Sequence, residues 1–270
     1  MNETFFESLE KDFRTIKLGI DAAEFAKLAE EQAFSEAQLE AIGVLFGYLS
    51  DRKMQTTIAT LLKMSHLPLK EPKTFGNFNF DLIKGKDAEK LRTLPSLSAI
   101  YAHRNLAFIG PAGTGKTHLA QAFGYECCQR GLKTYFIKMS ELRDKFTAAR
   151  RAGKESSVIN GLVRPSCLII DEVGHCEFDK ENTRLFFDLI DRRYNKEGNF
   201  NIVFTSNKNP MQWRENFNED DALLCALDRI FDDATVFTIR GESYRGRNTE
   251  KISLQTSRVP AVKTTEGKFK

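Results

Sequence analysis

The sequence lacks long apolar runs, and this absence bears on where the protein acts. No stretch of about 18 or more apolar residues is present, so no segment is predicted to span a membrane. The first ten residues are acidic and lack the basic start and apolar run of a secretory signal. We therefore expect a cytoplasmic protein without a membrane partner.

Cysteine is scarce too. The chain has five cysteines, which form no Cys-x-x-Cys pair and show no spacing typical of a metal site. An odd number in a chain of this kind predicts reduced thiols, buried as small apolar side chains. The sequence thus predicts neither a disulfide framework nor a cysteine-bound metal.

What the chain does have is an uneven distribution of charge. Residues 1–50 carry four lysines and arginines against ten acidic residues, whereas residues 236–270 carry eight against three. This asymmetry favours a polyanion as partner of the basic part. The acidic surface of the N-terminal part favours a protein partner over DNA.

Apolar periodicity predicts a small helical bundle in residues 1–70. The bundle either caps the next domain or binds a partner protein. Pro68 and Pro72 mark the linker that ends it. Three short amphipathic helices are expected from three stripes: Phe5, Leu9, Phe13, Ile16 and Ile20; Ile42, Leu45, Phe46 and Leu49; and Ile58, Leu61 and Leu62.

Residues 71–250 alternate apolar strands with helical stretches. This alternation predicts an α/β fold, with a three-layer α/β/α arrangement around a parallel sheet. Residues 251–270 have little to bury and are predicted to be a disordered basic tail. Strands are expected at residues 105–109, 134–137, 167–170 and 201–205, and helices near residues 116–130, 140–151 and 180–195.

A phosphate-binding loop follows the first of these strands. Residues 110–117 read Gly-Pro-Ala-Gly-Thr-Gly-Lys-Thr, which matches G-x-x-x-x-G-K-[ST] between a strand and a helix. Glycines let the backbone wrap phosphates, and the N–H groups of the loop and helix N-terminus attract their charge. Lys116 is expected to reach the β- and γ-phosphates, and Thr117 to ligate Mg²⁺. The predicted ATP contacts are Gly110, Pro111, Ala112, Gly113, Thr114, Gly115, Lys116, Thr117 and His118.

Polar side chains also follow two later strands. Asp171 and Glu172 end the third strand, where two acids are costly unless they serve a cation or a polar site. We expect Asp171 to hold Mg²⁺ and Glu172 to orient or deprotonate the attacking water. Asn207, after the fourth strand, is expected to hydrogen-bond the γ-phosphate or that water. Together with the loop, these residues predict hydrolysis of ATP to ADP and phosphate.

Two arginines complete the candidate site. Arg229 lies in a predicted helix at residues 222–231, and Arg245 ends the segment Arg-Gly-Glu-Ser-Tyr-Arg that begins at Arg240. An arginine delivered across a subunit boundary stabilises charge in phosphoryl transfer, and Arg245 could contact the same phosphates from within the chain. A surface ion pair is the alternative for each.

Taken in order, these motifs resemble those of IstB-like proteins, ATP-binding helpers encoded beside the transposase in certain insertion sequences. The resemblance covers roughly residues 74–247 and implies an AAA+ ATPase of the initiator clade, with DnaC and DnaA as relatives. Phe75 and Phe78 either flank the adenine or pack in the core. His175 stands where the family has an aromatic residue, and we expect this departure to matter little. The matching segments are Gly-Pro-Ala-Gly-Thr-Gly-Lys-Thr-His-Leu-Ala, Leu-Ile-Ile-Asp-Glu-Val-Gly, Thr-Ser-Asn, Leu-Asp-Arg and Arg-Gly-Glu-Ser-Tyr-Arg.

The resemblance implies a DNA-remodelling ATPase. Members of the family bind double-stranded DNA with little sequence preference, assemble on it into ATP-dependent oligomers and present it to a transposase, which stimulates hydrolysis. By the same resemblance, Arg229 is a catalytic arginine finger that acts in trans within a homo-oligomer. Arg245 is then the second sensor, in contact with the nucleotide.

The candidate DNA contact lies at residues 140–154, where initiator-type AAA+ proteins carry an additional helix. Phosphate contacts are expected, which position the protein without reading sequence and weaken as salt rises. A solvated helix with its charges on the outer face is the alternative. The five basic residues are Arg143, Lys145, Arg150, Arg151 and Lys154.

Two other functions stay open at this point. A DnaC-like replicative helicase loader shares every nucleotide motif and differs in what its N-terminal bundle grips. A small-molecule kinase with the same loop needs an acceptor pocket and a lid with arginines, but neither Asn207 nor an arginine in trans. The segment from Arg240 to Arg245 favours the transposition function.

Overall fold

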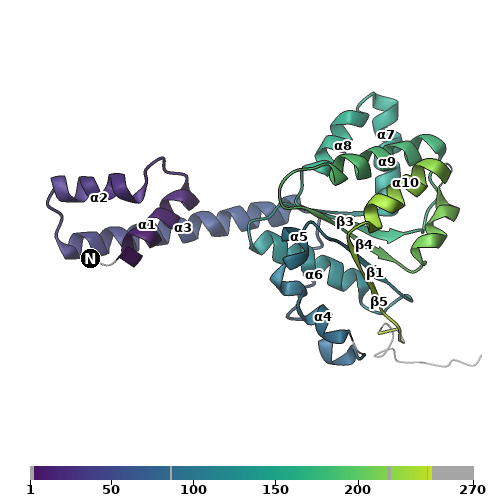
Figure 1. Ribbon diagram of the computed structural model, residues 1–270, viewed down its shortest axis with the longest axis horizontal. Coiled ribbons are helices and arrows are strands. Elements are labelled where there is room, and N and C mark those ends of the chain that lie inside the picture. Colours follow the sequence, from purple (N-terminus) through teal and green to yellow (C-terminus); the bar gives the residue numbers. More distant parts are fainter. Residues whose placement is uncertain (1–2, 86, 218–219, 242, 245–270) are drawn as a thin grey trace, which may run out of the picture.

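A five-stranded parallel sheet lies at the centre of the computed structural model, which describes residues 3–85, 87–217, 220–241 and 243–244 (Figure 1). The strands pair in the order β2-β3-β4-β1-β5. The first four lie where the sequence predicts strands, whereas the edge strand β5 has no counterpart in the prediction. The strands are β1 (Asn105–Ile109), β2 (Thr134–Lys138), β3 (Cys167–Val173), β4 (Asn201–Ser206) and β5 (Ala234–Thr238).

Helices cover both faces of this sheet, which confirms the predicted three-layer α/β/α fold (Figure 1). Helix α8 is not among the predicted helices; Gly153, with φ 61°, ends α7 and turns the chain into α8. One face carries α4 (Ala88–Arg92), α5 (Ser98–Tyr101) and α6 (Lys116–Gln129), and the other carries α7 (Met139–Ala152), α8 (Glu155–Val163), α9 (Lys180–Tyr194) and α10 (Asp220–Phe231). Short 3₁₀ helices lie at Phe80–Leu82, Leu94–Ser96 and Pro210–Asn216.

Two apolar cores hold these layers together. Leu168 and Ile170 of β3 pack with Phe146 in the core beneath α7 to α10. Ile169, between them in sequence, packs with Phe123 in the core beneath α6. A strand that is buried on both faces reads as a continuous apolar run, which is why β3 is evident in the sequence.

Three N-terminal helices form a lobe that projects from this domain (Figure 1). Two of the three predicted helices are one: the stripes around Leu49 and Ile58 both lie on α3, which has 29 residues. The sequence between these two residues contains neither glycine nor proline, so nothing ends the helix there. Helix α2 was missed by the periodicity and begins after Asp21, which caps it. The lobe comprises α1 (Glu3–Ile16), α2 (Ala22–Glu31) and α3 (Glu36–Met64).

The lobe has its own small core and one uncovered apolar face. Leu45 and Leu49 of the second predicted apolar stripe lie on α3 and are exposed together with Val44 and Tyr48. At its far end α3 reaches the sheet, where the Phe136 N–H of β2 donates to the carbonyl of Ser65 at 2.7 Å. The core consists of Leu9, Phe13, Phe25, Ala29 and Leu39.

Two expectations concern the chain as a whole. Among the helices of the described ranges, none is both long and apolar enough to cross a membrane. The predicted basic tail, residues 251–270, lies outside the described residues.

Candidate nucleotide-binding site

The predicted phosphate loop connects β1 to α6 at the carboxyl end of the sheet. Two of its glycines are required by close contacts. A Cβ at Gly110 would lie 2.0 Å from the carbonyl oxygen of Ile239, and a Cβ at Gly113 would lie 1.9 Å from Oγ of Ser243. Both glycines also have positive φ, at 153° and 78°. The segment after β5 therefore packs directly against this loop.

The residues after the loop meet the end of β3. Lys116 is buried and its Nζ donates to the carbonyl of Pro111 at 2.6 Å. The Thr117 hydroxyl donates to Oδ1 of Asp171 at 2.9 Å. The Thr205 hydroxyl of β4 donates to the same oxygen at 2.5 Å and accepts the backbone N–H of Glu172 at 3.0 Å. Three chain segments are thus joined at one carboxylate.

Asp171 lies in a setting that suits a cation. Burial raises the pKa of its carboxyl group, and the hydrogen bonds from Thr205 and Thr117 oppose that shift. A nearby cation offsets such a desolvation penalty. Mg²⁺ is commonly held by one or two protein ligands together with phosphate oxygens and water. Asp171 and Thr117 supply such a set, and the described residues contain no cluster of three acidic, histidine or cysteine side chains that would suggest a different metal site.

Glu172 and Asn207 lie at the mouth of the site. Glu172 has φ 61°, and its carboxylate forms an ion pair with Nζ of Lys138 at 3.2 Å. Nδ2 of Asn207 lies 3.3 Å from Nε2 of His175. The expectation that His175 matters little is therefore incomplete, because this side chain contacts Asn207, a predicted residue of the site.

One cavity of about 290 Å³ brings most of the predicted site together. Four of its lining residues are outside the predicted set: Lys73, Gln121, Thr205 and Ser206. Thr205 and Ser206 belong to the Thr-Ser-Asn segment that ends at Asn207. Lys73 and Gln121 match none of the motifs described above, so no sequence signal points to them. The predicted residues that line it are Ala112, Gly113, Gly115, Lys116, Thr117, His118, Glu172 and Asn207.

His118 connects the site to the segment at the start of residues 71–250. Its Nε2 lies 2.9 Å from the carbonyl of Thr74 and 2.9 Å from Oδ1 of Asn77. Burial lowers the pKa of the imidazole. Phe75 and Phe78 pack against the core beneath α6, which agrees with the core-packing alternative for these two rings.

A second cavity, of about 760 Å³, lies on the other side of the loop. Thr114 of the loop lines it, and so does Tyr244, whose N–H donates to the carbonyl of Gly113 at 2.9 Å. Arg245, the next residue, lies outside the described residues. Apolar parts of the lining come from Leu82, Ile83, Leu91, Val236 and Phe237.

Arg229 is not brought to this site. It lines a separate cavity of about 220 Å³ together with Asn105 and Ile202, which lie at the amino ends of β1 and β4. The phosphate loop lies at the opposite end of these parallel strands. Within one chain, the structure therefore separates Arg229 from Lys116 by the length of the sheet.

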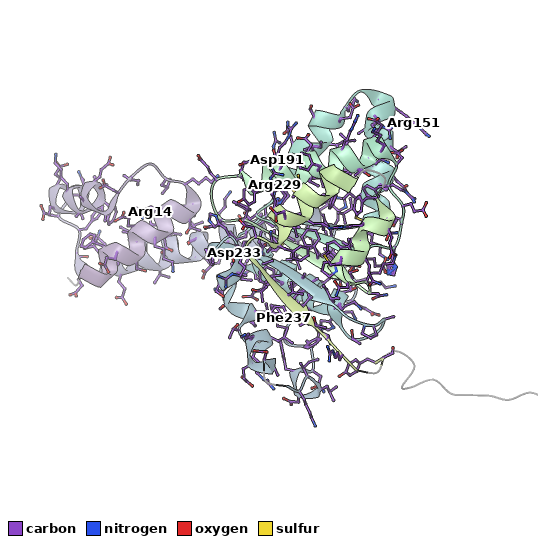
Figure 2. All side chains as sticks on the ribbon, turned by 45° about the vertical axis from the view of Figure 1, so that its right-hand side comes forward. Arg14, Arg151, Asp191, Arg229, Asp233 and Phe237 are labelled. Carbon is purple, nitrogen blue, oxygen red and sulfur yellow. The ribbon has the colours of Figure 1, made fainter. Side chains whose placement is uncertain are left out.

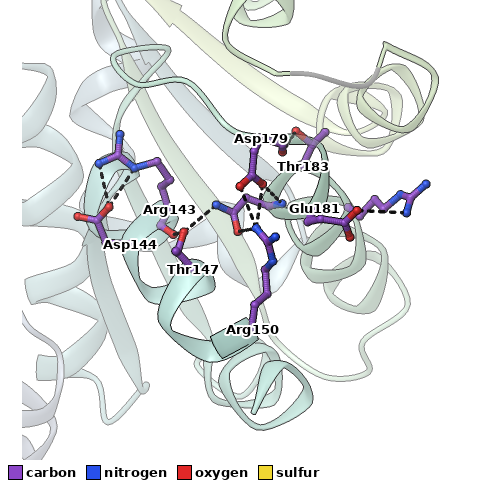
Figure 3. A network of polar contacts seen from close by, with 9 residues as sticks. Arg143, Asp144, Thr147, Arg150, Asp179, Glu181 and Thr183 are labelled. Carbon is purple, nitrogen blue, oxygen red and sulfur yellow. Dashed lines mark hydrogen bonds and ion pairs between the residues drawn. The ribbon is translucent and has the colours of Figure 1, made fainter. Parts of the chain in front are cut away.

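The five candidate DNA contacts differ in their surroundings, and Figure 3 shows two of them, Arg143 and Arg150. Arg143 pairs with Asp144 at 2.8 Å, and Arg150 pairs with Asp179 at 2.9 Å and with Oδ1 of Asn182 at 3.3 Å. Arg150 thereby joins α7 to the N-cap of α9.

The other three candidates face outward. Nζ of Lys145 lies 5.8 Å from the ring centre of Tyr135. Arg151 and Lys154 are exposed, and Arg151 lies at the outer end of the α7 and α8 pair (Figure 2). Arg151 and Lys154 are thus two exposed cations where α7 turns into α8.

Comparison with known proteins gives relatives across most of the chain. Residues 11–252 match the family described as IstB-like ATP binding protein. The chain is 37% identical to the ATP-binding protein of insertion sequence IS5376 from Geobacillus stearothermophilus, over 72% of this chain and 76% of that protein. It is 31% identical to the ATP-binding protein of insertion sequence IS21 from Pseudomonas aeruginosa, over 78% of each chain.

Solved structures show the same fold. AMPPCP-bound DnaA from Aquifex aeolicus matches with a TM-score of 0.52 and 21% identity over 65% of this chain. The match spans about half of the DnaA chain, 51%. DnaI matches with a TM-score of 0.52 and 17% identity, over 64% of this chain and 90% of that one.

Proposed function

This chain belongs to the family of IstB-like ATP-binding proteins, and from that premise we propose that it hydrolyses ATP, assembles on double-stranded DNA and assists a transposase. The observation that carries the ATPase proposal is the junction of Thr117, Asp171 and Thr205 beside Glu172. At this junction Asp171, the proposed cation ligand, and Glu172, the proposed base, follow one another in β3 beside the phosphate loop.

Each residue of the site has a proposed role. Lys116 and the N–H groups of the loop bind the β- and γ-phosphates, and Asp171 and Thr117 hold Mg²⁺, which neutralises phosphate charge when bound. Glu172 accepts the proton of the attacking water. The Asn207 amide orients that water or the γ-phosphate. The catalytic set is thus Lys116, Glu172 and Asn207, completed by Arg229 of a neighbouring subunit.

The remaining nucleotide contacts are assigned by position. We place the adenine in the cavity of about 760 Å³ beside Thr114, because it adjoins the loop and part of its lining is apolar. The Tyr244 N–H donates to the loop, and Arg245 is the next residue in the sequence. This supports the assignment of Arg245 as the second sensor.

DNA binding is assigned to the exposed cations at the α7 and α8 hairpin. Lys145, Arg151 and Lys154 make phosphate contacts, whereas Arg143 and Arg150 contribute mainly through their bonds to acidic neighbours. Such contacts carry no base information, in keeping with binding that is independent of sequence.

The division into domains follows from the same assignment. We propose residues 1–70 as a partner-binding lobe, residues 71–250 as the ATPase domain and residues 251–270 as a basic tail. The exposed apolar face of α3, with Val44 and Tyr48, supports a protein contact for the lobe.

The experiment that tests this function is the measurement of oligomer size on double-stranded DNA. With a non-hydrolysable ATP analogue, the wild-type chain is expected to assemble, whereas Lys116→Ala is expected to remain unassembled. Assembly of both proteins to the same size, or of neither, contradicts the proposal. Co-purification with a replicative helicase in place of a transposase would favour the loader function.

A further inference from the structure

The guanidinium of Arg229 rests in a seat formed by one face of α9 (Figure 2). Its Nη2 lies 3.2 Å from Oδ1 of Asp191. The guanidinium carbon lies 5.2 Å from the ring centre of Phe187 and 6.0 Å from that of Tyr194. The three residues are spaced by four and three along α9, so they share a face of the helix. The seat therefore consists of one carboxylate between two aromatic rings.

The seat is itself held in place. The Tyr194 hydroxyl donates to Oδ2 of Asp232 at 3.0 Å, just after the end of α10. Helix α10, which carries Arg229, is thus bonded to α9 at two points about one helical turn apart. Both helices pack on the core beneath them through buried residues such as Ile190 and Ile230. The guanidinium is fixed relative to the sheet as a result.

The cavity beside this seat is lined by charged side chains of both signs. Three are cations, Arg193, Lys196 and Arg229, and two are carboxylates, Asp232 and Asp233. Burial lowers the pKa of Arg193 to about 10, which leaves this side chain protonated at neutral pH. Its hydrogen bonds go to backbone carbonyls of residues 162, 163, 165, 166 and 201. The cations of the lining outnumber its carboxylates by one, which leaves the wall weakly positive.

The ion pair with Asp191 contributes little to folding. Both side chains are about one-third exposed, at 32% and 36%, and such pairs add little net stability in water. What the pair does restrict is the position of a long and flexible side chain. Fixing that position before reaction removes an ordering cost from the transition state.

We propose that Asp191 is a positioning residue, which holds Arg229 in the orientation that reaches the nucleotide of a neighbouring subunit. This inference rests on the proposed function, in which Arg229 acts in trans. A guanidinium has five N–H donors in a planar fork. Asp191 engages Nη2 and the carbonyl of Cys225 lies 3.5 Å from Nη1, so donors remain to bind phosphate oxygens. Asp191 thus orients the fork without saturating it.

The test is the steady-state ATPase rate of the full-length chain, saturated with double-stranded DNA. Asp191→Asn is expected to lower kcat about tenfold without changing KM for ATP, since misplacing a catalytic group affects the chemical step. Asp188→Asn is the matched control, because Asp188 lies on the same helix and forms an equally exposed ion pair with Arg192 at 2.8 Å. This control is expected to retain its kcat, and Asp191→Glu to recover part of the loss.

The dependence on Arg229 is tested in the double variant. In the Arg229→Ala background, Asp191→Asn is expected to cause no further loss, because Asp191 acts through that arginine. An additional loss in that background, an unchanged kcat in the single variant, or an increase in kcat would each overturn the positioning role. If Arg229→Ala alone keeps the wild-type kcat, the trans-acting arginine itself is contradicted, which is a failure of the proposed function.

Discussion

Lys138 and Glu172 form an ion pair at 3.2 Å at the carboxyl ends of the neighbouring strands β2 and β3. Lys138 is the last residue of β2, and α7 with its exposed cations begins directly after it. The proposed base of the ATPase is therefore bonded to the residue that precedes the proposed DNA-binding helix. Any movement of α7 on DNA would change this contact.

Lys138→Met is expected to raise the ATPase rate measured without DNA. Removal of the ammonium group frees the carboxylate of Glu172, and a half-exposed ion pair of this kind corresponds to a change of about two- to fivefold. The ratio of the ATPase rates with and without DNA should fall by a similar factor. Phosphate release with and without DNA measures both effects, and a lower rate without DNA would show that Lys138 assists Glu172 instead of restraining it.

Thr205→Val is expected to destabilise the domain. The hydroxyl is buried and connects Asp171 with the Glu172 N–H, so its removal leaves a buried N–H group without an acceptor. A loss of about 1–3 kcal/mol in the free energy of unfolding is expected from one such unsatisfied group. Urea denaturation measures it. Thr147→Val is the control, because the Thr147 hydroxyl forms more accessible hydrogen bonds. Equal losses in the free energy of unfolding of both variants would contradict the larger contribution expected from Thr205.

Asp171→Asn is expected to stabilise the protein in the absence of nucleotide while abolishing hydrolysis. Burial raises the pKa of Asp171, so the folded state binds its proton more tightly than the unfolded state does. The stabilising contribution of the protonated form is complete below the unfolded pKa and is lost as the pH rises through the folded pKa.

The increase in stability caused by Asp171→Asn should therefore be largest at neutral pH and become smaller as the pH is lowered. For a chain of this length, we expect Asp171→Asn to raise Tm by about 2 °C or more at neutral pH. Thermal denaturation at several pH values checks the trend. A gain that grows on acidification would contradict the direction of the pKa shift.

Arg151→Ala and Lys154→Ala together are expected to weaken DNA binding and reduce its salt dependence. Each lost phosphate contact lowers the slope of log K against log salt by about 0.9, so the pair should lower it by about two. Arg150→Ala is the matched control, because Arg150 is engaged by Asp179. Binding titrations at several salt concentrations measure the slopes, and equal slopes for all variants would place the DNA elsewhere.

The sequence predicts those parts of the molecule that local patterns determine. The loop at residues 110–117 and the buried strands β1 to β4 lie where they were expected, because consecutive residues carry both signals. The edge strand β5 escaped prediction, since two of its five residues are polar and its side chains are partly buried or exposed. Helix α3 was divided in two because its apolar contacts change along its length, from α1 near its start to α6 and β2 near its end.

Contacts between distant segments could not be predicted. Thr205 lies 34 positions after Asp171, and the seat of Arg229 is built on a helix that precedes it by more than 30 residues. Such pairs depend on how the sheet is wound and on which helices pack together. The pairing of Arg150 with Asp179 has the same origin, and it changes the interpretation of a basic stretch that looks uniform in the sequence.

The most direct test of the account is phosphate release by the wild-type chain and by Glu172→Gln, with ATP binding measured in parallel. Glu177→Gln is the control, because Glu177 is an exposed acid in the segment that follows β3. Glu172→Gln is expected to bind ATP like the wild type and to hydrolyse it at least about 100-fold more slowly, as expected for loss of a general base. Unchanged hydrolysis by Glu172→Gln, or a wild-type chain that binds ATP and releases no phosphate with or without DNA, would contradict it.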